Sequence, residues 1–178
     1  MTTAGLRPSP LTALVLVVRL PPALEALRWR SIADVPAGVP AHVTLLWPFA
    51  EEGSLDADVL DTVTRIVARH APLDLVLGEG RRFPDTLYAS VEPDAPLRAL
   101  QAELAAAFPT LPLYGGEHTF VPHVSVVEGA AATMPEAFAD PAWAELPVRH
   151  HAGAVGLITR RNGTWGSRHQ FPLGGLGG

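Results

Sequence analysis

AHVTLLWPF, residues 41–49, is a mostly apolar run that carries one histidine and one threonine. Successive side chains of a strand point to opposite sides. His42 and Thr44 would therefore share one side, and the apolar residues that alternate with them would face a core. A lone histidine in an apolar strand most often has a structural role. The pattern becomes informative because residues 122–127, PHVSVV, repeat it.

The second stretch places His123 and Ser125 on one face of a strand, with Val124 and Val126 on the other. Chance His-x-Thr/Ser strings are easily found in a chain with 7 histidines. Two such strings in apolar strands, at matching positions of two similar halves, are much less expected by chance. The repeat therefore indicates two equivalent strands.

Hydrophobic periodicity and turn residues predict alternating strands and helices along the chain. Strands are expected at residues 11–20, 39–47, 73–77, 86–91 and 120–127. Helices are expected at residues 23–30, 55–70, 95–108 and 135–146. Asn162-Gly163 is a strong two-residue turn signal, and it predicts a hairpin in the C-terminal segment.

This order is β-α-β-α-β followed by β-α-β-α-β-β, so two halves of similar plan meet near Gly80. No linker rich in Gly, Ser or Pro separates them. The sequence therefore predicts an α+β fold in a single bilobal domain, residues 11–172. A flexible N-terminal segment, residues 1–10, and a flexible tail, residues 173–178, are expected on either side.

Two absences restrict the chemistry. The chain has no Cys, which excludes disulfides, thiolate nucleophiles and Cys-ligated zinc. It also has no Lys, since all 13 basic residues are Arg. That excludes a P-loop lysine, a lysine Schiff base and the lysine–nucleotide adduct of an ATP-dependent ligase. Catalysis must therefore rest on His, carboxylates, hydroxyls, Tyr and Arg, and we expect no cofactor.

The net charge of −5 argues against binding of long duplex nucleic acid, which needs a basic face. A local arginine patch would still suit a single phosphate. The apolar run near the N-terminus is too short to span a bilayer, and no signal-peptide cleavage pattern follows it. We expect a cytoplasmic monomer that does not contact membranes.

The paired motifs resemble those of the 2H phosphoesterase superfamily, which includes bacterial 2′-5′ RNA ligase-like and 2′,3′-cyclic phosphodiesterase proteins. The resemblance rests on HVTLLWPF at 42–49 and FVPHVSVV at 120–127, and its element order covers about residues 11–172. It implies two pseudo-symmetric lobes whose antiparallel sheets face a central cleft. All four motif side chains would then point into that cleft.

These residue types suit the opening of a cyclic phosphodiester. A base must take a proton from the attacking water or hydroxyl, and an acid must protonate the departing oxygen on the opposite side. Histidine titrates close enough to neutral pH for either role. We therefore expect His42 and His123 to be the acid–base pair, with His123 as base and His42 as acid in hydrolysis. Thr44 and Ser125 would hold the phosphate oxygens, and the scheme requires no metal.

Three aromatic residues are candidates for substrate binding. For Trp47, Phe49 and Phe120, packing in the core or at a lobe edge is better supported than base stacking. Of these, Phe49 and Phe120 are the better stacking candidates, because they flank the two motifs near strand or loop ends. Tyr88 lies on a strand before a helix and would reach the cleft, although burial is at least as well supported.

Three functions remain open from the sequence. The first is hydrolysis of 2′,3′-cyclic phosphates or related small nucleotide or RNA-end phosphodiesters, including 2′-5′ linkages. The second is ATP-independent 2′-5′ RNA end joining, the reverse reaction. The third is a non-catalytic nucleotide-binding module that uses the same cleft, and the intact pair of motifs argues against it. A metal-dependent hydrolase is weaker, since carboxylates do not cluster with the histidines.

Overall fold

The structure, a computed structural model, describes residues 11–111 and 119–175. Its strands are β1 (Leu11–Val17), β2 (His42–Leu46), β3 (Leu73–Phe83), β4 (Thr86–Glu92), β5 (His123–Glu128), β6 (Val148–Ala152), β7 (Ala154–Arg161) and β8 (Thr164–Pro172). Its helices are α1 (Pro22–Ser31), α2 (Ala57–Val67), α3 (Asp94–Ala107) and α4 (Pro135–Phe138), with short 3-10 turns η1 (Glu52–Ser54), η3 (Gly129–Thr133) and η4 (Pro141–Glu145).

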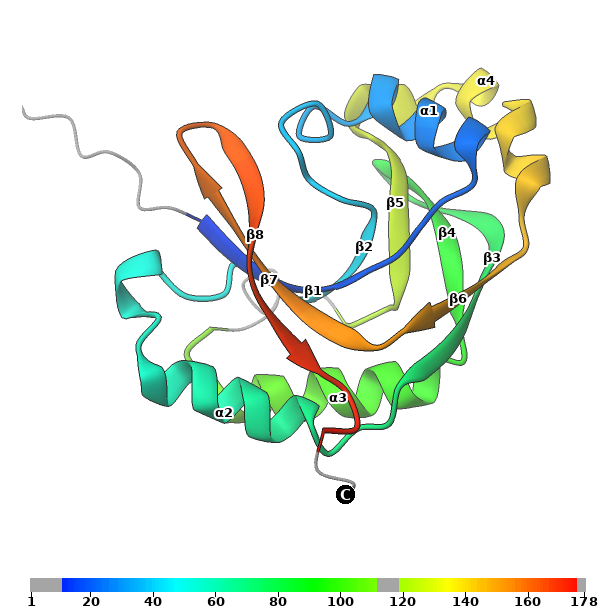
Figure 1. Cartoon of the computed structure of the whole chain (residues 1–178). Coiled ribbons are helices and arrows are strands. Elements are labelled where there is room, and N and C mark those ends of the chain that lie inside the picture. Colours follow the sequence, from blue (N-terminus) through cyan, green and yellow to red (C-terminus); the bar gives the residue numbers. More distant parts are fainter. Residues whose placement is uncertain (1–10, 112–118, 176–178) are drawn as a thin grey trace, which may run out of the picture.

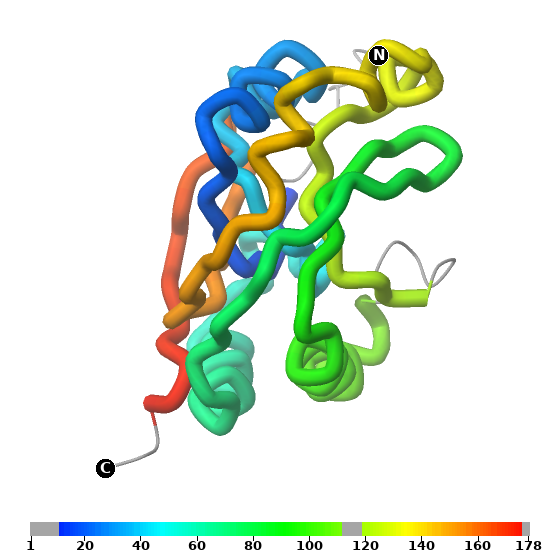
Figure 2. The backbone as a smooth tube through the Cα atoms, turned by 90° about the vertical axis from the view of Figure 1, so that its right-hand side faces the viewer, coloured from blue at the N-terminus to red at the C-terminus, as the bar shows by residue number. Residues whose placement is uncertain are grey.

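The strands form two antiparallel four-stranded sheets, which confirms the predicted α+β fold of two lobes in one domain. One sheet has the order β2-β1-β7-β8 and the other the order β5-β4-β3-β6. Figure 1 shows α1 and α4 together at one end of the sheets and α2 and α3 at the other, and Figure 2 shows α2 and α3 side by side.

The sheets do not correspond to the two halves of the sequence. β3, the last strand of the predicted first half, pairs with β4 and β6. The C-terminal strand β7 pairs with β1 and completes the sheet that holds β2. The predicted division near Gly80 is therefore wrong, because Gly80 lies inside β3. Local patterns do not show which distant strands pair, since pairing depends on contacts made across the whole chain.

β3 is also longer than the predicted strand at 73–77. A register shift between Leu77 and Gly80 interrupts its pairing with β4, and two glycines there hide the alternation of apolar residues. A Cβ at Gly80 would lie 2.8 Å from the Trp143 ring, so the glycine allows the indole to pack on the strand. The strand therefore continues across a stretch that reads as loop.

One hydrophobic core joins the two sheets. It contains Leu14 and Val43 from the first sheet, Leu75 and Val124 from the second, and apolar side chains of α2 and α3. A shared core explains why the lobes form one domain. Helix α1 belongs to a smaller cluster, in which its Leu24 and Leu27 contact β4, β5 and the turns near α4. The N-terminal helix therefore covers the sheet that carries His123.

The predicted helix at 135–146 is wrong in its extent. It is divided into α4 and the 3-10 turn η4, because Pro141 cannot continue a helix. The Asp140 carboxylate accepts a hydrogen bond from the Ala142 N–H at 2.9 Å and begins the new turn.

The C-terminal hairpin is confirmed. Asn162 and Gly163 link β7 to β8 with positive φ angles of 51° and 82°, which suit a tight hairpin turn. After β8, Leu173 is buried, and the Gly174 N–H donates to the His70 carbonyl at 2.7 Å. The predicted N-terminal segment 1–10 and residues 176–178 of the predicted tail lie outside the described residues. No helix in 11–111 or 119–175 has the length and apolar character needed to cross a membrane.

Candidate active site

The two His-x-Thr/Ser strands have the same pattern of burial. In β2 the side chains of His42 and Thr44 are half-buried, while Val43 is 1% exposed. In β5 the pattern is identical, with His123 and Ser125 half-buried and the valines that follow each of them fully buried. The alternation expected of a strand with one core face therefore holds in both motifs.

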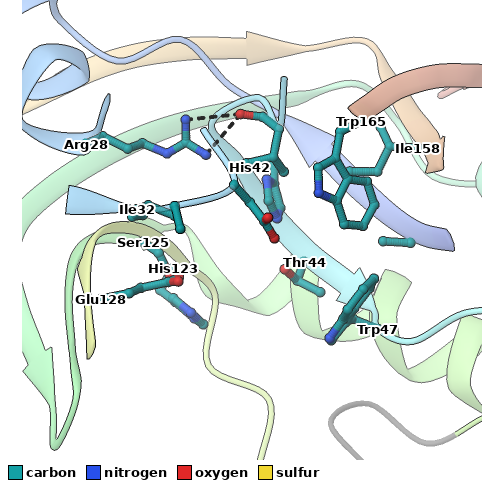
Figure 3. Close-up of a pocket in the computed structure, with 14 residues that line it drawn as sticks. Arg28, Ile32, His42, Thr44, Trp47, His123, Ser125, Glu128, Ile158 and Trp165 are labelled. Carbon is teal, nitrogen blue, oxygen red and sulfur yellow. Dashed lines mark hydrogen bonds between the residues drawn. The ribbon is translucent and has the colours of Figure 1, made fainter. Parts of the chain in front are cut away.

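The structure brings all four motif side chains to one cavity. β2 and β5 are the edge strands of their sheets and contact each other. His42, Thr44, His123 and Ser125 line a cavity of about 400 Å³ between them (Figure 3). The four side chains therefore lie around one cavity, as expected. Their catalytic role stays a prediction.

Both imidazoles are held in the same way. His42 Nδ1 lies 2.7 Å from the Pro40 carbonyl oxygen, and His123 Nδ1 lies 2.7 Å from the Val121 carbonyl oxygen. Each partner is the carbonyl two residues earlier in the chain. A carbonyl oxygen only accepts, so Nδ1 must carry the proton and donate. In the neutral ring Nε2 is then unprotonated, and it is the nitrogen left to meet a ligand.

Burial favours the neutral form of both histidines. The pKa of His42 is lowered to about 4, mainly by desolvation, with smaller contributions from the positive charges of Arg28 and of protonated His123. Desolvation also lowers the pKa of His123 from its usual 6.5, whereas the Glu128 carboxylate opposes that shift. The two rings therefore differ in their charged neighbours, a cation beside His42 and an anion near His123.

Arg28 is a site residue that the sequence did not indicate. It lies on α1, is 2% exposed, and lines the cavity with the histidines (Figure 3). Its guanidinium donates to the Val39 and Pro40 carbonyls and pairs with Glu25 at 3.1 Å. Its spacing from Leu24 could have indicated it. Arg28 follows Leu24 by four residues, so it lies on the apolar face of its helix, where a charged side chain is unusual.

Two tryptophans form an apolar wall of the same cavity. The rings of Trp47 and Trp165 are 5.5 Å apart between centroids and tilted by 52°. The sequence favoured packing for Trp47 and gave no signal for Trp165, which reaches the site only because β8 joins the first sheet. The buried Trp165 Nε1–H has no hydrogen-bond partner among the described residues. Within that part of the chain it is therefore an unpaired buried donor in the wall of the cavity.

A second cavity, of about 710 Å³, adjoins the first and shares Thr44, His123, Ser125 and Glu128 with it. Its other walls come from the β3–β4 hairpin and from the segment that leads into β5. Phe120, a predicted substrate-binding residue, lines this cavity. Phe83 lies in the hairpin that forms another wall, and the sequence did not indicate it.

The other two aromatic candidates lie elsewhere. Tyr88 is buried and lines neither cavity; its ring lies near those of Phe83 and His123, with centroid distances of 4.3 Å and 5.2 Å. Tyr88 therefore supports the His123 ring. Phe49 is 1% exposed and packs edge-on against Phe108 in the core. The expectation that Phe49 stacks on substrate is wrong, because its side chain is enclosed in the main hydrophobic core.

A family model for the 2′-5′ RNA ligase superfamily matches residues 18–164. The chain belongs to the 2′-5′ RNA ligase superfamily, a group of 2H phosphoesterases. The matched residues include both His-x-Thr/Ser strands and Arg28. This membership confirms the resemblance found in the sequence.

Solved structures of the superfamily share the fold. TT0787 of Thermus thermophilus is 21% identical, with a TM-score of 0.60 over 94% of this chain and 99% of that chain. E. coli LigT complexed with 3′-AMP is 15% identical, with a TM-score of 0.55 over 93% and 98%. LigT has also been solved with NADP+ and with ATP. No curated protein sequence matches this chain.

Proposed function

We propose that this protein is a phosphodiesterase that opens 2′,3′-cyclic phosphates or related small nucleotide or RNA-end phosphodiesters. His42 and His123 are its acid–base pair, and Thr44 and Ser125 hold the phosphate oxygens. The observation that carries this proposal is the matched pair of imidazoles. In each, Nδ1 is hydrogen-bonded to the carbonyl two residues earlier, so the two Nε2 atoms are left to contact a ligand in the cavity that both rings line.

In the proposed reaction a water oxygen forms a bond to phosphorus while one P–O ester bond breaks. The neutral imidazole takes a proton from the water at Nε2. The protonated imidazole gives its Nε2 proton to the departing oxygen, which leaves as a hydroxyl. A 2′,3′-cyclic phosphate becomes a monoester, and each histidine ends in the state in which the other began. Hydroxyl donors at Thr44 and Ser125 offset charge on the remaining phosphate oxygens.

The charges around the two rings favour one assignment of roles. Arg28 disfavours the imidazolium form of His42, and Glu128 favours that of His123. We therefore assign His42 as base and His123 as acid in hydrolysis, the reverse of the roles expected from the sequence. A bound phosphodiester carries a negative charge and raises the pKa of both rings, which supplies the one proton that the mechanism needs.

Two alternative functions would use the same cleft. End joining would use the same histidines in the reverse direction, with a 5′-hydroxyl attacking the cyclic phosphate, and needs no ATP. A non-catalytic module would need neither free Nε2 atom. The small-nucleotide complexes of LigT agree with a nucleotide ligand. The cytoplasmic location and monomeric state remain predictions from the sequence.

The test is a panel of 2′,3′-cyclic nucleotides, a 2′-5′ dinucleotide and an RNA with a cyclic phosphate end, assayed with EDTA. His42→Ala and His123→Ala should each lower kcat by about 10²–10⁴-fold on every active substrate. His151→Ala is the matched control, because this exposed histidine of β6 pairs with Asp74 and lies outside both cavities. Equal rates for wild type and the His42→Ala, His123→Ala double variant would refute the proposal.

A further inference from the structure

The second cavity is lined by two phenylalanines, and we call it the phenylalanine pocket: Phe83, Pro84 and Thr86 come from the β3–β4 hairpin, and Phe120 and Val121 from the segment before β5. We propose that the phenylalanine pocket is a second substrate subsite, which binds an uncharged planar group esterified to the phosphate. This inference rests on the proposed function, since the phosphate is placed between the two histidines.

The shared residues define where the phosphate lies relative to both cavities. Thr44, His123 and Ser125 line the first cavity and the phenylalanine pocket alike. A phosphodiester has two ester oxygens, so a phosphate at these residues directs one substituent toward Trp47 and Trp165 and the other into the phenylalanine pocket. A cyclic nucleotide occupies only one side. Both cavities lie within the size range of pockets for small ligands.

The aromatic surfaces of the phenylalanine pocket are held in place. Phe83 stacks on Tyr88 at 4.3 Å and meets the His123 ring edge-on at 5.1 Å. The main-chain carbonyl of Phe120 accepts a hydrogen bond from Arg98, which is itself paired with Asp94 at 2.8 Å. The Phe83 ring and the main chain at Phe120 are therefore held in place, and a fixed aromatic face loses little conformational freedom when a planar group stacks on it.

The charges of the phenylalanine pocket indicate an uncharged group. Asp85 and Glu128 line it, and among the described residues that form its walls there is no Arg. The first cavity, in contrast, includes Arg28. A substituent with its own phosphate or carboxylate would be repelled by the two carboxylates. The preferred substrate class is therefore a linear diester whose second group is a planar alcohol without further charge, such as an unphosphorylated nucleoside.

The test compares esters of adenosine 2′-monophosphate. The benzyl and methyl esters have leaving alcohols of similar acidity, so the chemical step is matched. Wild type should favour the benzyl ester by about ten- to a hundredfold in kcat/KM, the range expected for one stacked ring. Phe120→Ala should remove most of this preference, because it lowers kcat/KM for the benzyl ester more than for the methyl ester. Phe138→Ala, an exposed phenylalanine of α4, is the matched control and should leave the preference unchanged.

A second comparison tests the charge of the pocket and does not require removal of a packed aromatic ring. Wild type should cleave the 4-carboxybenzyl ester more slowly than the benzyl ester, and Asp85→Asn should narrow that difference. If 2′,3′-cyclic AMP is opened but the benzyl and methyl esters react equally, the subsite is wrong and the proposed function stands. If folded Phe120→Ala loses the same factor in kcat/KM on the benzyl and methyl esters, the proposed subsite is also wrong. If no substrate reacts faster with wild type than with the double histidine variant, the proposed function itself fails.

Discussion

Arg28 and His42 donate hydrogen bonds to the same oxygen, the main-chain carbonyl of Pro40. Arg28 Nη2 lies 2.8 Å from it and His42 Nδ1 lies 2.7 Å from it. The arginine therefore fixes the group that orients the imidazole, and it places a permanent positive charge beside the ring. His123 has the same type of carbonyl partner, at Val121, and its charged neighbour is Glu128 instead. The pseudo-symmetric pair is thus electrostatically unequal.

Replacing Arg28 should raise the pKa of His42. In Arg28→Met the shared carbonyl accepts only from His42 and the neighbouring charge is gone, and both changes favour the imidazolium form. The ¹⁵N chemical shifts of the two imidazoles, followed against pH, measure the effect. His123 in the same molecule is the internal control, and Arg28→Lys, which keeps the charge, should retain most of the depression. A pKa of His42 that is unchanged in folded Arg28→Met would contradict this role.

The pH profile of kcat/KM should have its optimum at lower pH than that of kcat. The free enzyme needs one protonated ring, but the pKa of His42 is lowered to about 4 and that of His123 is also lowered from 6.5. As pH rises above 6.5, the fraction of free enzyme with one proton therefore falls. Bound phosphodiester raises both pKa values, so the basic limb of kcat lies at higher pH. Steady-state kinetics on a 2′,3′-cyclic nucleotide measure both profiles, and superimposed profiles would contradict the expectation.

The hydroxyl pair should contribute to the rate. Thr44→Val and Ser125→Ala remove the proposed donors to the phosphate oxygens and keep the side-chain volume nearly constant. Each should lower kcat by about 10²-fold, the lower range for loss of one such donor. Thr64→Val on α2 is the control, because its hydroxyl bonds within its own helix, at 2.8 Å from the Leu60 carbonyl. Full activity of both cavity variants would exclude this role.

Gly38 should tolerate alanine less well than Gly163 does. Both glycines have positive φ, 98° and 82°, where an L-residue costs about 1–2 kcal/mol. A Cβ at Gly38 would also lie 2.8 Å from the Trp165 carbonyl oxygen, whereas one at Gly163 meets nothing within 4 Å. Gly38→Ala should therefore lower the free energy of unfolding by more than Gly163→Ala. Urea midpoints at unchanged m measure the difference, and equal losses would show that the contact relaxes without cost.

The two strands that carry the histidines could be predicted from the sequence because their information is local. Alternation in β2 and β5 places the apolar side chains in the core and His42 and His123 outside it, whatever the strands pair with. The tail hairpin was predictable for the same reason, since Asn162-Gly163 specifies its own turn.

The rest of the site depends on pairing between distant segments. Trp165 reaches the cavity because β7 pairs with β1, and Phe83 because the β3–β4 hairpin extends beyond the apolar run of β3. Phe49 follows the first motif closely in sequence, but it lies beyond the end of β2, so the alternation of that strand does not set its direction, and it packs in the core. Arg28 was missed because α1 packs on the sheet of the other lobe.

The two sheets that form the walls of the cleft become complete at different stages of synthesis. Every strand of the His123 sheet lies between Leu73 and Ala152, so that sheet can pair while the chain is still growing. The His42 sheet must wait for β7 and β8, although its first strands were synthesised long before. Until β7 forms, β1 pairs only with β2, and its other edge is open for association with other chains. A nascent chain halted before β7 would carry both histidines but lack two strands of the His42 sheet, so we expect it to have none of the proposed activity.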